Sequence, residues 1–253
     1  MNNSTYLLYI LIVLMSVLQQ NKALFIPDIV WSINQFLDHE DKLFQCSKYL
    51  YDLKLTYYEL SKEKSFQYYH DVEFRTLMLS KVLDSSKQIG LYLNYSQKIV
   101  DLSNLGKVHT LYLKYCPNVT DVTALRTVHT LDLSGCQNIT NIFNLGSVHT
   151  LNLSDCQNIT DVSALGTVHT LNLSYCQNVT DVFALRTVHT LDLSDCPNVT
   201  DVTALSNVHT LDLSGCQNIT DVSALRTVHI LDSHNCPYIT DVSTLTNVHT
   251  LFR

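Results

Sequence analysis

Cysteine and histidine, two side chains that do chemistry, recur through this sequence at a spacing of 20 residues. Seven of the eight cysteines share one position of the period: Cys116, Cys136, Cys156, Cys176, Cys196, Cys216 and Cys236. Zinc sites use clustered CxxC or mixed Cys/His spacing, and this chain has neither. We therefore expect a column of buried, reduced thiols, and free thiols at this density fit a reducing compartment.

The histidines form a second column: His109, His129, His149, His169, His189, His209, His229 and His249. Imidazoles stacked at strand spacing could bind a metal or respond to pH. However, a repeat copies every residue into a column, whether functional or not, and we predict neither a metal nor a cofactor. Like charges that close together hinder protonation, so we expect acid to strain the array.

Aspartate and asparagine recur in the same way. Most units carry an Asp after a Thr: Asp121, Asp161, Asp181, Asp201, Asp221 and Asp241. Calcium would need several carboxylates in one loop, so we expect each Asp to cap the following turn by accepting backbone N–H groups. Asn-x-Thr sequons such as Asn118-Val119-Thr120 fall at a repeat position, so their number says little about glycosylation.

These columns depend on a repeat that begins at Leu91 and continues without a gap to a partial ninth unit at Leu251. The inward positions of one unit are Val128, Leu131, Leu133, Cys136, Ile139, Ile142 and Leu145. The two leucines alternate as in a strand, and the later positions recur every third residue, as in a tight turn or 3₁₀ segment. One unit cannot enclose these residues, but stacked units can, with their strands side by side in a parallel sheet.

The unit resembles the leucine-rich repeat, whose pattern LxxLxLxxC/NxxI matches Val128 to Ile139. The resemblance covers residues 91–253 and implies an α/β solenoid with a curved binding surface. The first unit departs most, since Ser96 stands where the others have cysteine.

Residues that break the period on the outward strand positions are the candidates for binding a target protein. They are Tyr92, Tyr95, Tyr112, Lys114, Tyr115, Asp155, Tyr175, Asp195 and His234. Exposed tyrosines are favoured as interface anchors, and the aspartates make an acidic zone further along. The alternative for the early tyrosines is packing against residues 54–90, and we weigh the two equally.

Residues 24–53 resemble an F-box, a short helical unit. Pro27-Asp28-Ile29 corresponds to the opening of that motif and Cys46-Ser47-Lys48 to its end. The resemblance implies docking to the Skp-type adaptor of a cullin ubiquitin ligase. The contact candidates are Pro27, Ile29, Ile33, Leu37 and Phe44. The alternative is a helical cap on the solenoid.

Two further segments complete the chain. Residues 54–90 are predicted to be a helical linker that covers the first repeat, with Val72, Phe74, Leu77, Met78 and Val82 at roughly helical spacing. Residues 1–23 contain the apolar stretch Tyr6–Leu18, which has the length of a signal-peptide core but lacks a preceding Lys or Arg. It is read as a signal, an anchor or a buried helix.

The charge of the chain limits its partners. The formal net charge is −7, and residues 91–253 contain 7 Lys/Arg and 13 Asp with no Glu. Such a surface repels a phosphate backbone, which disfavours nucleic-acid binding. We expect a non-enzymatic, intracellular (cytoplasmic or nuclear) adaptor for an unknown protein substrate. The alternative is a secreted or membrane-anchored adhesin or receptor.

Overall fold

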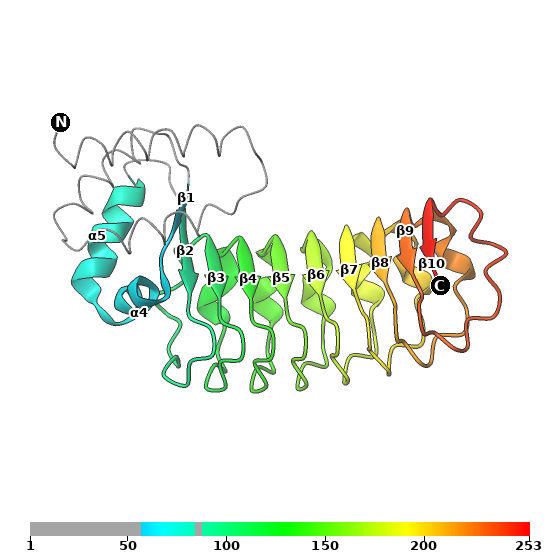
Figure 1. The fold of residues 1–253 in the computed structure, drawn as a ribbon, viewed down its shortest axis with the longest axis horizontal. Coiled ribbons are helices and arrows are strands. Elements are labelled where there is room, and N and C mark those ends of the chain that lie inside the picture. Colours follow the sequence, from blue (N-terminus) through cyan, green and yellow to red (C-terminus); the bar gives the residue numbers. More distant parts are fainter. Residues whose placement is uncertain (1–56, 84–87) are drawn as a thin grey trace, which may run out of the picture. The chain divides into compact units, whose positions relative to one another are not determined.

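The computed structural model describes residues 57–83 and 88–253, which belong to one unit, Thr56–Arg253. The expectations for residues 1–23 and 24–53, with the five adaptor-contact candidates, lie outside the described residues. Within them, ten strands form one sheet in sequence order, each parallel to its neighbours (Figure 1). The predicted parallel sheet of 20-residue units is confirmed.

The strands are short, and equivalent residues of successive units pair, such as Leu111 with Leu131. Their bounds are β1 Tyr57–Glu59, β2 Gln88–Tyr92, β3 Thr110–Tyr112, β4 Thr130–Asp132, β5 Thr150–Asn152, β6 Thr170–Asn172, β7 Thr190–Asp192, β8 Thr210–Asp212, β9 Ile230–Asp232 and β10 Thr250–Phe252. The 3₁₀ turns are η1 Thr123–Thr127, η2 Phe143–Ser147, η3 Ser163–Thr167, η4 Phe183–Thr187, η5 Thr203–Asn207 and η6 Ser223–Thr227. The three-residue spacing of apolar positions predicted these turns, and they are confirmed.

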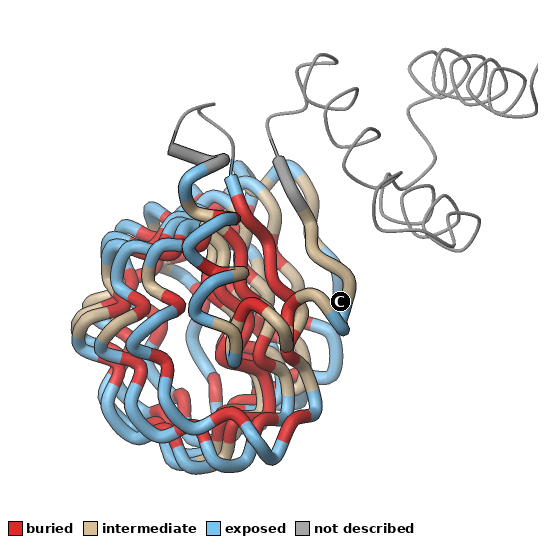
Figure 2. Tube along the Cα trace, turned by 90° about the vertical axis from the view of Figure 1, so that its left-hand side faces the viewer, coloured by how far each residue is buried: buried red, intermediate tan, exposed pale blue. Residues whose placement is uncertain are grey.

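The core runs along the inside of the coil, where buried residues line each turn and exposed residues lie outside (Figure 2). In one unit Leu131, Leu133, Cys136, Ile139 and Leu145 are all at most 1% exposed. Burying one such aliphatic side chain contributes about 1.5–3 kcal/mol. Because each unit covers the apolar face of the next, stability comes from stacking and not from any unit alone.

The first edge of the array is covered by β1 and two helices, α4 Lys62–His70 and α5 Val72–Leu83. Ser61 caps α4 by accepting the Lys64 N–H, and the Asp71 carboxylate accepts the Phe74 N–H in the first turn of α5. The helices predicted for this segment are present, but the strand β1, which pairs with β2, was not predicted from the sequence. A three-residue strand leaves little periodicity to detect, and its partner lies about thirty residues away.

Candidate protein-interaction surface

The cysteine column is buried inside the coil. Each column thiol of the described residues is free and buried, and each contacts the carbonyl oxygen of the residue 23 positions earlier. The Cys176 thiol, for example, donates to the Leu153 carbonyl at 3.1 Å. Burial raises the pKa of Cys136 to about 12 and that of Cys176 to about 11. The prediction of buried thiols is confirmed, and the thiol–carbonyl contacts of the column link successive units.

The histidine column is a continuous stack of imidazole rings. Neighbouring ring centroids are 4.5 to 4.7 Å apart from His109 to His249. The Nδ1 atom of most rings contacts the hydroxyl of the following Thr, as in His189 with Thr190 at 3.2 Å. Where Ile230 replaces that Thr, the ring of His229 tilts by 33° relative to His209. The Thr hydroxyl therefore orients each ring in the stack.

The aspartates of the turn position cap the turns that follow them, most of which are 3₁₀ turns. Each accepts the backbone N–H of the residue two positions later: the donors are Thr123, Ser163, Phe183, Thr203, Ser223 and Ser243. The N–H of Ser223 holds the pKa of the Asp221 carboxyl below its usual range. The predicted capping role is confirmed. Asn141 does the same for Phe143 in the one unit that lacks the aspartate.

Substitution of one cap gives a direct test. Asp221→Ala removes the acceptor of the Ser223 N–H and should measurably lower the free energy of unfolding. Asp221→Asn keeps an acceptor, as Asn141 does, and should cost less. Urea unfolding followed by circular dichroism measures both. Equal losses in the two variants would mean that the charge, not the hydrogen bond, matters.

Tyrosines of the first repeats form two stacked pairs on the sheet face. The rings of Tyr92 and Tyr112 are 4.6 Å apart, and those of Tyr95 and Tyr115 are 5.6 Å apart. The first pair is half-buried beside the N-terminal elements: burial and the Glu59 charge raise the pKa of Tyr112. The second pair is open, with Tyr95 67% and Tyr115 48% exposed. Tyr92 and Tyr112 thus fit packing against the N-terminal elements, whereas Tyr95 and Tyr115 fit an open binding surface. The role of these tyrosines in binding a target stays a prediction.

Next to these tyrosines lies an aspartate on an outward strand position that is nearly buried. Asp132 is only 7% exposed, because its carboxylate accepts hydrogen bonds from the backbone and hydroxyl of Ser134. Lys114 lies 3.2 Å away and pairs with the second oxygen. A candidate for target binding, Lys114 is therefore engaged in an ion pair in this structure.

The candidates Asp155, Tyr175 and Asp195 share the position of Tyr95 and Tyr115 in successive units. All five have left-handed backbone, with φ between 50° and 61°. The third residue after the end of each of these strands must therefore tolerate a positive φ, which Gly135, Gly215 and Asn235 do readily. This Gly/Asn alternation was a signal in the sequence that could have identified the left-handed position.

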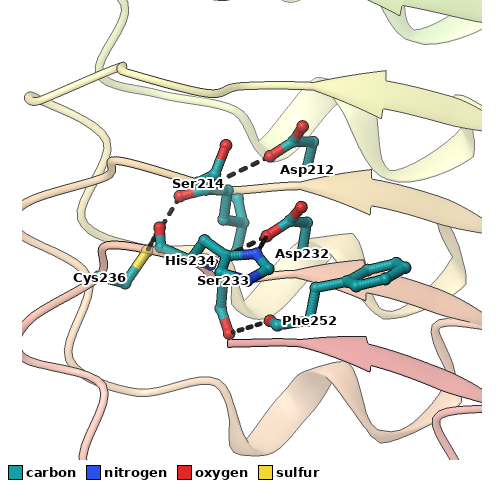
Figure 3. Close-up of polar contacts among 8 residues, drawn as sticks. Asp212, Ser214, Asp232, Ser233, His234, Cys236 and Phe252 are labelled. Carbon is teal, nitrogen blue, oxygen red and sulfur yellow. Dashed lines mark hydrogen bonds and ion pairs between the residues drawn. The ribbon is translucent and has the colours of Figure 1, made fainter.

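His234 is the last candidate, near the C-terminal strand. Its Nδ1 lies 2.8 Å from the Asp232 carboxylate, and its ring centroid lies 6.1 Å from that of Phe252 (Figure 3). Ser233 donates to the Phe252 carbonyl beside it. The structure therefore keeps His234 far along the array from the early tyrosines, so the nine candidates do not form one site.

In residues 57–83 and 88–253, no three His, Cys, Asp or Glu side chains gather as a metal site. Over the same part of the chain, no helix has the length and apolar character that crossing a membrane requires.

The family model described as Leucine Rich repeat matches residues 124–142, 147–166 and 204–225. No curated protein matches the sequence. Internalin C2 from Listeria monocytogenes is similar at 25% identity and a TM-score of 0.46, over 59% of this chain and 73% of that one. The functional domain of InlJ from Listeria monocytogenes, which includes a cysteine ladder, is similar at 20% identity and a TM-score of 0.35, over 65% and 51%.

The family model covers separate repeats rather than most of the chain, whereas the regular pairing of β2 to β10 runs through every unit. Inward Leu, Cys and Val/Ile positions, a short parallel strand and a 3₁₀ turn recur in the order that the repeat requires. Residues 91–253 are a leucine-rich-repeat solenoid.

Proposed function

We propose that this chain is a non-catalytic adaptor that holds a partner protein on the outer face of its sheet. The observation that carries the proposal is the exposed pair Tyr95 and Tyr115, whose stacked rings lie just beyond the carboxyl ends of β2 and β3. Aromatic rings of this kind bury large areas at a low entropic cost, which makes them favoured interface anchors.

The double variant Tyr95→Asn, Tyr115→Asn tests the face. Asn235 occupies the same left-handed position, so asparagine is compatible with the backbone. Partner proteins that bind the unmodified chain in a lysate of its source organism should be lost by this double variant. They should still bind Phe143→Ser, the control, which removes an exposed ring from a turn instead of from the sheet face. Retention of every partner by the tyrosine variant would refute the proposal.

For the N-terminal part we propose docking to a Skp-type adaptor of a cullin ubiquitin ligase through Pro27, Ile29, Ile33, Leu37 and Phe44. The F-box-like sequence of residues 24–53 supports it. Affinity purification with mass spectrometry from eukaryotic cells should recover the adaptor and cullin, and Leu37→Ala should lose both. Absence of both the adaptor and the cullin from the sample purified with the unmodified chain would refute this proposal.

The second candidate is a secreted or membrane-anchored adhesin or receptor, favoured by the apolar stretch Tyr6–Leu18. It uses the same sheet face but requires export. The intact mass of the protein from its host separates the two candidates. Cleavage near Ala23, or added glycans on the sequon asparagines, would support export, whereas the unprocessed mass would contradict a cleaved signal.

A further inference from the structure

The left-handed positions form a column that runs across the sheet just beyond the carboxyl ends of its strands. We call Tyr95, Tyr115, Gly135, Asp155, Tyr175, Asp195, Gly215 and Asn235 the left-handed column. A residue with a Cβ is strained in this conformation, whereas glycine is not. Since glycine and asparagine already serve three units, the turn itself does not require tyrosine or aspartate. Five units carry these side chains despite the strain.

The column presents its side chains to solvent. Tyr95, Tyr115 and Tyr175 are 67%, 48% and 54% exposed. Glycines make room for their neighbours: a Cβ on Gly135 would lie 2.3 Å from the Tyr115 ring, and one on Gly215 would lie 2.3 Å from the Asp195 carboxylate. The Tyr115 ring and the Asp195 carboxylate therefore lie over the glycine of the next unit, while Asp155 is half-buried.

Tyr175 lies between two carboxylates in this column. Asp155 and Asp195 occupy the units on either side, each about 4.8 Å away along the sheet. The Asp195 carboxylate, which accepts a hydrogen bond from the hydroxyl of Tyr175, raises the pKa of that hydroxyl. Asp192, on the neighbouring strand position, adds a further negative charge near the ring.

These charges have no cationic partner within the described residues. The ion pairs found there join Lys114 with Asp132 and His234 with Asp232, and neither involves the left-handed column. The Asp155 carboxylate accepts only a neutral amide, from Gln157 at 2.8 Å. A ring flanked by carboxylates attracts a cation to its face and favours Arg or Lys.

We propose that the left-handed column binds a basic, extended segment of a partner protein, with one Arg or Lys side chain over Tyr175 between Asp155 and Asp195. The rest of the segment runs across four units from Tyr175 to Tyr95, a distance of about 19 Å. This inference rests on the proposed function, whose face it shares, and adds the chemistry of the partner.

The test uses the full chain and a fluorescent peptide of about eight residues alternating Arg and Ser, long enough to span that distance when extended. Fluorescence anisotropy measures its affinity, with an equivalent Glu–Ser peptide for comparison. The double variant Asp155→Asn, Asp195→Asn should weaken binding about tenfold, and Tyr175→Asn several-fold. Asn235 shows that asparagine is compatible with this backbone position.

The matched control is Asp161→Asn, Asp201→Asn, which removes the same charge from the turn position, where Asn141 already serves. Because salt screens charges at that distance, this control should weaken binding of the basic peptide by about twofold at most at physiological salt. Equal weakening by both double variants, or equal binding of the acidic peptide, would overturn the inference. If the basic peptide fails to bind while Tyr95→Asn, Tyr115→Asn still loses its protein partner, this inference falls and the proposed function remains.

Discussion

In the folded protein, the thiols of Cys136 and Cys216 should react with iodoacetamide about a thousandfold more slowly than in the unfolded chain. Alkylation requires the thiolate, and a pKa of about 12 in place of 9.0 lowers the thiolate fraction at neutral pH by that factor. Both side chains are also 0% exposed, so the reagent has no access without opening of the coil. Peptide mapping by mass spectrometry, with and without guanidinium, measures each cysteine separately.

Labelling of Cys136 in the native protein at the unfolded rate would contradict this structure of the column. The result also bears on localisation. A thiol protected by burial stays reduced in an oxidising compartment as well as in a reducing one. The cysteine count of the sequence, taken by itself to favour a reducing compartment, therefore does not separate an intracellular adaptor from an exported one.

The melting temperature should fall by several degrees between pH 7.5 and pH 5.5, because of the histidine column. Burial and then the neighbouring imidazoles lower the pKa of His149 and His209 below the ordinary value of 6.5, and burial does the same for His109. The unfolded chain therefore takes up protons first as the pH falls. Stability is fully present above pH 6.5 and is lost as the pH falls toward the folded-state values.

The capping aspartates lose their contribution at a different pH. Hydrogen bonds from the turn residues lower the pKa of carboxyls such as Asp161 and Asp221 below 3.8, so their stabilisation is lost only as the pH falls below that value. The two transitions can thus be separated by calorimetry across the pH range.

Replacement of both His149 and His209 by Gln should reduce the slope of melting temperature against pH between 7.5 and 5.5. A melting temperature independent of pH in the parent chain, or the same slope in the double variant, would refute the argument from stacked imidazoles.

The sequence by itself determined the solenoid, because its period copies one inward pattern through every unit. Leu131, Leu133 and Cys136 must all be covered by the next repeat, and only a stacked parallel sheet does so. The stacked histidines and capping aspartates followed from the same register.

Only the tertiary structure decided which outward residues are open. Tyr112 and Tyr115 are three residues apart in one unit, yet the first is shielded near β1 and the second is exposed. Asp132 is buried by Ser134 and paired with Lys114 from the preceding unit, which no pattern within one repeat reveals. The reason is physical: a repeat fixes which face a side chain takes, but neighbours from other units and from the N-terminal elements fix its exposure and its charge partners.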